Sequence, residues 1–189
     1  MIFRSVELGW AEGTNFFPSR IIERLDDSKY SHVYWKFTME NGLRFLYESH
    51  LNGGVQITPY EHLERAMFQN RVASICEIPV TCNADALWNE CLKYHGDPYD
   101  VGQIIRYYIW IKWFHRKGEV YRPYVNDKFT CNEFIVTTGK PIIIAMHALD
   151  YSYTPEGLFR YFMGHASRNP ATLVAAKAQK RPHFQIQLA

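Results

Sequence analysis

The segment Phe129-Thr130-Cys131-Asn132-Glu133-Phe134 says most about how this chain folds. Thr130 and Glu133 stand at the spacing of a capping box. In that motif the threonine hydroxyl accepts from the Glu133 backbone N–H, and the glutamate side chain accepts from the backbone N–H of the cap. The segment therefore predicts that Thr130 is the N-cap of a helix that begins at Cys131 and stops at Gly139.

Cys131 is thereby placed in the first turn of a helix. Unpaired backbone N–H groups and the positive end of the helix dipole converge there. Such a position favours the thiolate, which is the nucleophilic form of cysteine. The alternative is a small buried apolar residue, the role that most free cysteines have. Cys131 is the candidate nucleophile, and its partners must come from elsewhere in the chain.

The composition is that of a folded domain. The 189 residues are 47% hydrophobic and 16% aromatic, which excludes a disordered chain and suggests a groove lined with rings. We expect one domain over residues 1–166 and a basic, weakly helical tail over residues 167–189. The formal net charge of +2 demands neither nucleic acid nor an acidic membrane, so no nucleic acid is expected as a partner and peripheral membrane contact is not favoured.

The four cysteines, Cys76, Cys82, Cys91 and Cys131, form no C-x-x-C pair. A zinc ribbon or thioredoxin-type site is therefore not expected, and neither a metal nor a cofactor is predicted. Charged residues interrupt the first apolar stretch, unlike in a signal peptide. We expect free thiols in a reducing, cytoplasmic setting.

The periodicity of the apolar residues predicts strands mostly before residue 81 and helices mostly after it. Strands are expected over residues 2–10, 31–38, 43–50, 55–57 and 71–80, and helices over residues 18–25, 58–67, 83–94, 99–115, 130–138 and 158–162. A second capping box, Thr58-Pro59-Tyr60-Glu61, is expected to open the 58–67 helix. Residues 141–146 fit either a strand or a buried helix. This order predicts an α+β fold.

A base for Cys131 is sought among eight histidines. Six of them fit helix ends, the solvated surface, the tail or the core, which leaves His32 and His50 in the predicted hairpin. A three-residue loop at residues 40–42 pairs Met39 with Leu43, and then His32, His50, Tyr34 and Glu48 share one face of the sheet. A two-residue loop would send Glu48 to the other face. In the first register His32 serves as the base and is oriented by Glu48 or His50. The alternative is that His32 is a structural residue of the strand whose ring hydrogen-bonds to a backbone group.

Several short motifs resemble the permuted papain-like cysteine hydrolases, the YiiX/YaeF-like branch of the NlpC superfamily, which is related to lecithin:retinol acyltransferase. They occur in the family's order within residues 28–160: Ser31-His32-Val33, Tyr47-Glu48-Ser49, Gly54-Val55 with Thr58-Pro59, Gly96-Asp97-Pro98-Tyr99-Asp100, Thr130-Cys131-Asn132-Glu133, and Thr154-Pro155 with Leu158. Two departures are Asn132, where the family has serine, and a longer, more aromatic segment over residues 106–124.

The resemblance implies an antiparallel sheet packed against helices, with the nucleophile at a helix N-terminus. It implies Cys131 as nucleophile and His32 as general base. Glu48 would orient the imidazole, with His50 as the alternative, and backbone N–H groups at the cysteine helix would form an oxyanion hole. We expect Tyr34, Tyr99 and Asn132 along the substrate cleft.

The expected activity is that of a cysteine hydrolase, an amidase or peptidase that cleaves an amide through a thioester acyl-enzyme. A small molecule, a peptide (peptidoglycan fragments included) or an acyl compound would be its substrate. Two alternatives stay open: a lipid acyltransferase or thioesterase on the same scaffold, and a binding protein that keeps the fold without turnover. The apolar stretch at residues 104–114 fits the core, with an acyl-chain groove or a membrane-facing patch as alternatives.

Overall fold

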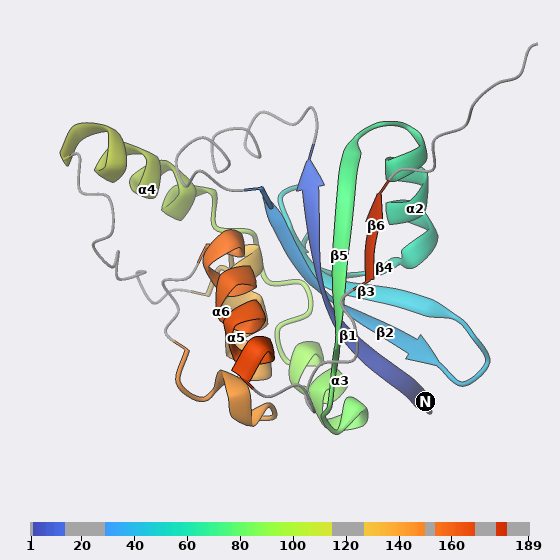
Figure 1. Ribbon diagram of the computed structural model, residues 1–189. Coiled ribbons are helices and arrows are strands. Elements are labelled where there is room, and N and C mark those ends of the chain that lie inside the picture. Colours follow the sequence, from blue (N-terminus) through green and yellow to red (C-terminus); the bar gives the residue numbers. More distant parts are fainter. Residues whose placement is uncertain (1, 14–28, 115–126, 150–153, 169–176, 181–189) are drawn as a thin grey trace, which may run out of the picture.

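The computed structural model describes residues 2–13, 29–114, 127–149, 154–168 and 177–180. Six strands form one antiparallel sheet in the order β4-β3-β2-β1-β5-β6 (Figure 1). The strands are β1 (Phe3–Gly13), β2 (His32–Met39), β3 (Arg44–His50), β4 (Gly54–Pro59), β5 (Val72–Val80) and β6 (Lys177–Lys180). The helices are α2 (Tyr60–Phe68), α3 (Ala84–Leu92), α4 (Val101–Phe114), α5 (Cys131–Gly139), the 3-10 turn η1 (Ile144–Met146) and α6 (Pro155–Arg168). The predicted α+β class is confirmed.

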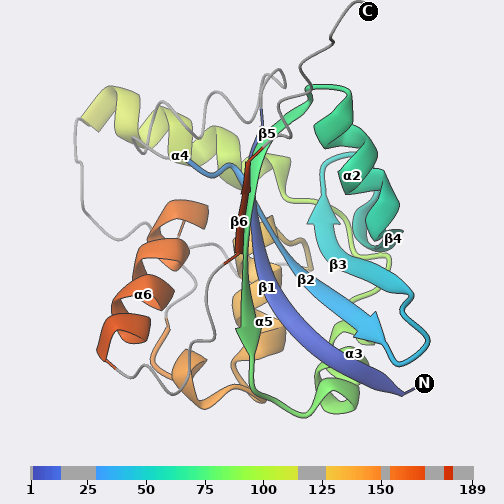
Figure 2. The same cartoon turned by 45° about the vertical axis from the view of Figure 1, so that its right-hand side comes forward.

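Helices cover both faces of the sheet, because successive strand residues point to opposite sides. On one face, Trp35 and Tyr47 pack in a core with Phe134 of α5 and Leu158 of α6. On the other face, α2 covers a smaller cluster: Ala11, Tyr34, Leu46, Tyr60, Leu63 and Ile75. Figure 1 and Figure 2 show α5 and α6 on one side of the sheet and α2 on the other.

The β2–β3 hairpin has the register that gathers the candidate site. The Met39 N–H donates to the Leu43 carbonyl at 2.8 Å, and Gly42 adopts a φ of +86° in the loop between them. Trp35 pairs with Tyr47, and continuing this register places Tyr34 opposite Glu48 and His32 opposite His50. The prediction of a three-residue loop is therefore confirmed, and the two-residue alternative is wrong.

Some predicted elements differ from the structure. No side chain caps α2, which begins at Tyr60 with Pro59 as N-cap, so the capping box at Thr58 is wrong. Residues 141–146 form no strand, and their last three residues make the 3-10 turn η1, in which Met146 is buried and Ile144 is exposed. The last helix is longer than predicted and runs to Arg168, and residues 177–180 of the expected helical tail form strand β6 on the edge of β5. The helix predicted at residues 18–25 lies outside the described residues.

Within the described part of the chain, no helix is both long enough and apolar enough to cross a bilayer.

Candidate active site

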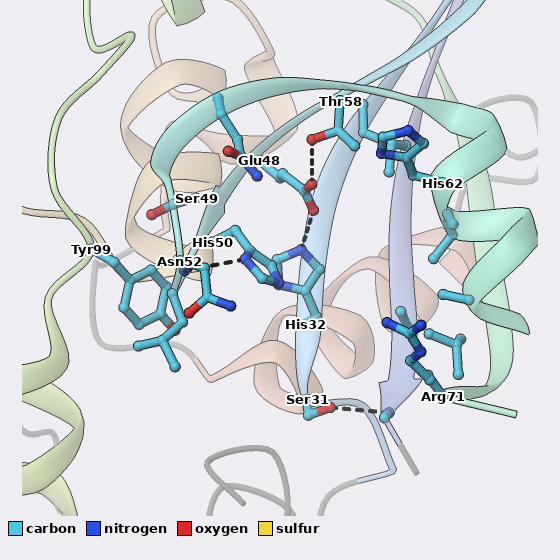
Figure 3. Close-up of a pocket in the computed structure, with 18 residues that line it drawn as sticks. Ser31, His32, Glu48, Ser49, His50, Asn52, Thr58, His62, Arg71 and Tyr99 are labelled. Atoms are coloured by element: carbon cyan, nitrogen blue, oxygen red, sulfur yellow. Dashed lines mark hydrogen bonds and ion pairs between the residues drawn. The ribbon is translucent and has the colours of Figure 1, made fainter. Parts of the chain in front are cut away.

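His32, the first residue of β2, forms an ion pair with Glu48 of β3. His32 Nε2 lies 2.7 Å from Glu48 Oε2, and Thr58 Oγ1 of β4 donates to Glu48 Oε1 at 2.8 Å (Figure 3). The His32 side chain is 23% exposed and the Glu48 side chain 8%. Each carboxylate oxygen thus has its own donor, and the buried carboxylate fixes the orientation of the imidazole.

Cys131 lies close enough to the same histidine to affect its pKa. Burial acts to lower the pKa of His32, but hydrogen bonds to the Cys131 side chain and to Glu48, together with the charge of Glu48, outweigh burial and raise this pKa to about 10. Burial acts to raise the pKa of Glu48, yet its hydrogen bond with His32 and the His32 charge lower it. The imidazole is therefore protonated at neutral pH. Since Nε2 is engaged by Glu48, Nδ1 is the nitrogen left to face the thiol.

The predicted capping box at the start of α5 is confirmed. The Glu133 N–H donates to Thr130 Oγ1 at 3.4 Å, and the Thr130 N–H donates to Glu133 Oε2 at 3.0 Å. Cys131 is consequently the first residue of α5, at the positive end of the helix dipole.

A buried hydrogen bond sets the position of α5 on the sheet. Trp35 Nε1 of β2 donates to Thr138 Oγ1 of α5 at 2.9 Å, and both residues are fully buried. Cys131 precedes Thr138 by about 10 Å of helix at 1.5 Å per residue. His32 precedes Trp35 by about 10 Å of strand at 3.3 Å per residue. The two matched lengths bring the thiol and the imidazole to the same end of the sheet.

The segment before Cys131 is tied to β3. Ser49 Oγ donates to the Phe129 carbonyl at 2.7 Å, and the Phe129 N–H donates to the Pro98 carbonyl at 3.1 Å. Ser49 follows Glu48 in β3, so one strand orients the imidazole through one residue and positions the cysteine helix through the next.

The glycine-containing segment at residues 96–100 has a structural role. The Val55 N–H of β4 donates to the Asp97 carbonyl, and the Gly96 N–H donates to the Val55 carbonyl, both at 2.8 Å. Gly54 has a φ of +65°, and a Cβ there would lie 2.1 Å from the Asp97 carbonyl oxygen. Only glycine allows this approach, which holds Gly96 and Asp97 against β4, two residues before Tyr99.

Tyr99 lines the pocket and lies close enough to Cys131 for the thiol to affect its pKa. Burial, followed by the charge of Cys131 and a hydrogen bond to it, raises the pKa of Tyr99 well above its ordinary value. The phenol therefore keeps its proton and can donate a hydrogen bond to negative charge near Sγ. The next residue, Asp100, accepts from the Gln103 N–H at 2.9 Å in the first turn of α4.

The remaining predicted site residues have different positions. His50 Nδ1 accepts from the Asn52 N–H at 3.3 Å, while the His50 ring stands edge-on to His32 with centroids 6.0 Å apart. Glu48 therefore holds His32 Nε2, and His50 packs beside the pair. Burial and the charge of His32 lower the pKa of His50. Asn132 lies beside the thiol, with its Oδ1 3.9 Å from Cys131 Sγ.

The expectation that Tyr34 borders the cleft is wrong. Tyr34 is fully buried, and its hydroxyl donates to Glu77 Oε1 at 3.0 Å. Its ring lies over Gly9, where a Cβ would come within 2.2 Å of it. Tyr34 thus reaches across β1 to a buried polar cluster on β5, in which Lys36 also contacts Glu77 at 2.6 Å.

The other three cysteines are also free, and the residues that affect their pKa values include Tyr30 and Lys29 for Cys76 but no histidine. Burial raises the pKa of Cys82 to about 11 and raises the pKa values of Cys76 and Cys91. Of the four cysteines, Cys131 is the one whose side chain interacts with protonated His32 in the described structure.

A pocket of about 460 Å³ opens between the sheet and α2 (Figure 3). Its wall contains His32, Glu48 and Tyr99, together with apolar and polar side chains: Leu46, Leu51, Leu63, Ala66, Val72, Ser49, His50, Asn52, Gln56, Thr58, His62 and Arg71. Cys131 is 2% exposed, and two of these wall residues, His32 and Tyr99, contact its side chain. A substrate in the pocket therefore meets the residues that flank the thiol.

The described side chains contain no group of three or more histidine, cysteine, aspartate or glutamate residues that could hold a metal ion.

No protein-family model matches this chain, and no curated protein matches its sequence. Among solved structures, the crystal structure of the metalloprotein YiiX from Escherichia coli O157:H7 is similar, with a TM-score of 0.53 and 15% sequence identity. The match covers 94% of this chain and 88% of that chain. The chain therefore has a fold like that of YiiX, and the likeness concerns the fold alone.

Proposed function

We propose that this protein is a cysteine hydrolase with a permuted papain-like fold, in which Cys131 is the nucleophile, His32 the general acid and base, and Glu48 the orienting carboxylate. The placement of His32 carries the proposal, because its ring is paired with Glu48 through Nε2 and lies close enough to Cys131 for the two side chains to interact. The chain order of histidine, acid and cysteine is the order of the permuted enzymes named above. The substrate is a small molecule, peptide or other acyl compound that the pocket admits.

In the first half of the reaction, the Cys131 thiolate attacks the carbonyl carbon of an amide. A carbon–sulfur bond forms as the carbonyl oxygen takes up negative charge. The backbone N–H of Cys131 in the first turn of α5 and the Tyr99 hydroxyl are the donors for this oxyanion. The carbon–nitrogen bond then breaks, His32 Nδ1 gives its proton to the departing nitrogen, and a thioester remains on Cys131.

In the second half, neutral His32 accepts a proton from water while the water oxygen attacks the thioester. The acyl group leaves as a carboxylic acid, and Cys131 returns as a thiolate beside protonated His32. An ester would follow the same steps with an alcohol as leaving group. If an acceptor other than water attacked the thioester, the acyl group would pass to that acceptor, and the protein would act as an acyltransferase.

YiiX is a metalloprotein, and that property is not extended to this chain. The described residues do not offer three converging ligands, as stated above. No step of the proposed reaction passes through a metal ion.

Hydrolysis of a panel of acyl amides and matched esters tests this proposal. Cys131→Ala is expected to lose turnover of every substrate that the wild-type protein cleaves. Cys82→Ala, which removes another free thiol, is the matched control and is expected to keep turnover. Thermal unfolding of both variants checks that each is folded. Wild-type turnover in Cys131→Ala would contradict the assignment.

A further inference from the structure

We propose that the pocket beside His32 binds an anionic group carried by the acyl part of the substrate, and that Arg71 is the residue that anchors this group. The inference rests on the proposed hydrolase function for the position of the reacting carbonyl. The anion site itself rests on the charge, shape and wall of the pocket.

The charges of the pocket wall favour an anion. In the pocket wall, Glu48 and protonated His32 neutralise each other as an ion pair. Two other cations on this side of the sheet have carboxylate partners: Lys36 contacts Glu77, and Arg44 contacts Glu64 at 3.0 Å. Among the residues that the structure describes, no carboxylate makes an ion pair with the exposed Arg71. Within the described part of the chain, Arg71 is therefore a cation of the pocket wall without a carboxylate in an ion pair with it.

Arg71 lies at the end of the pocket away from Tyr99. Figure 3 shows Tyr99 and Arg71 on opposite sides of the pocket, with His32 between them. The Arg71 backbone is fixed where α2 turns into β5: its N–H donates to the Ala66 carbonyl at 2.8 Å, and Asn70 before it adopts a φ of +59°. The anion site is therefore separated from the thiol by the width of the pocket.

The pocket wall also has apolar surface. Leu46, Leu63 and Val72 are among the residues that line it. A volume of about 460 Å³ lies within the range of small-ligand pockets. The pocket thus fits a short acyl chain whose carbonyl lies near His32 and Tyr99 and whose far end is anionic. A guanidinium forms paired hydrogen bonds with either a carboxylate or a phosphate, so the shared chemistry is that of an oxyanion.

The test compares two glutaric acid esters of p-nitrophenol, one with a free distal carboxylate and one with that carboxylate methylated. The measured quantity is the ratio of their kcat/KM values. The wild-type protein is expected to prefer the anionic ester, and Arg71→Gln is expected to lower the ratio about tenfold, as for loss of a charged hydrogen bond. Arg65→Gln, which removes an exposed α2 charge outside the pocket wall, is the control and is expected to keep the ratio. An unchanged ratio in Arg71→Gln would overturn the proposal.

A binding measurement separates this inference from the hydrolase proposal. Calorimetric titrations of Cys131→Ala use glutaramate, neutral glutaramide and phenyl phosphate. Glutaramate or phenyl phosphate is expected to bind more tightly than glutaramide. The double variant Cys131→Ala/Arg71→Gln is expected to abolish this difference. The anion that binds more tightly shows whether the site prefers a carboxylate or a phosphate. Anion binding that depends on Arg71, without turnover in the wild-type protein, would support the site and refute the hydrolase. Equal binding of the three probes would refute the site.

Discussion

Replacing Glu48 with glutamine is expected to lower the pKa of His32 while leaving the shape of the site nearly unchanged. In the wild-type protein this pKa is raised to about 10, in spite of burial, by contacts with Cys131 and Glu48. The Glu48 carboxylate lies 2.7 Å from Nε2. An opposite charge at such a distance shifts a pKa by about 1–3 units, so Glu48→Gln should bring the His32 pKa to about 7–9.

Ring nitrogen chemical shifts of ¹⁵N-labelled histidine, followed by NMR from about pH 5 to pH 11, measure this pKa without a substrate. Glu61→Gln is the matched control, because Glu61 is exposed on α2 and its nearest cation is Arg44 at 4.0 Å. It should leave the His32 titration in place. A wild-type His32 that titrates near pH 6.5, or one that titrates identically in Glu48→Gln, would refute the reasoning.

Three further outcomes are expected. The folded-state pKa of His32 lies above its ordinary value of 6.5, so protonated His32 stabilises the fold fully below pH 6.5, and this stabilisation is lost as the pH rises to about 10. The free energy of unfolding, measured by urea titration, should therefore fall over this window by at most about 5 kcal/mol. The same fall should be absent in His32→Gln. Tyr99→Ala should expose Cys131 and speed its labelling by iodoacetamide, measured by peptide mass spectrometry, whereas Tyr99→Phe, which keeps the ring, should stay closer to the wild-type rate; equal rates for both variants would contradict the position of the ring. Thr138→Val should destabilise the fold by about 1–3 kcal/mol in urea titrations because it leaves the buried Trp35 N–H without its acceptor; no loss of stability would contradict that role.

Local sequence patterns predicted the parts of the site that depend on neighbouring residues. The capping box at Thr130 fixed the start of α5, and the hairpin loop fixed which residues of β2 and β3 share a face. The same kind of pattern failed at Thr58. Thr58 pairs with Leu46 across β3 and β4, which places its hydroxyl diagonally from Glu48, and there it donates to the carboxylate instead of capping α2.

Local sequence patterns could not predict contacts between segments that lie far apart in the chain. The bond from Ser49 to the Phe129 carbonyl spans 80 residues of chain. The role of Tyr34 depends on Gly9 in the neighbouring strand β1 and on Glu77 in the strand beyond it, and strand order is a property of the whole sheet. Arg71 gains its position only when the turn after α2 closes one side of the pocket.

The most direct test of the account is to find where an acyl group attaches during turnover. The wild-type protein and Cys131→Ala are mixed with p-nitrophenyl acetate, quenched in acid, and examined by intact-protein and peptide mass spectrometry. The account predicts one acetyl group on Cys131 of the wild-type protein, released by neutral hydroxylamine as a thioester is, and none on the partly exposed Cys82. Equal acetylation of Cys131→Ala, or an acetyl group found on Cys82 instead, would contradict it.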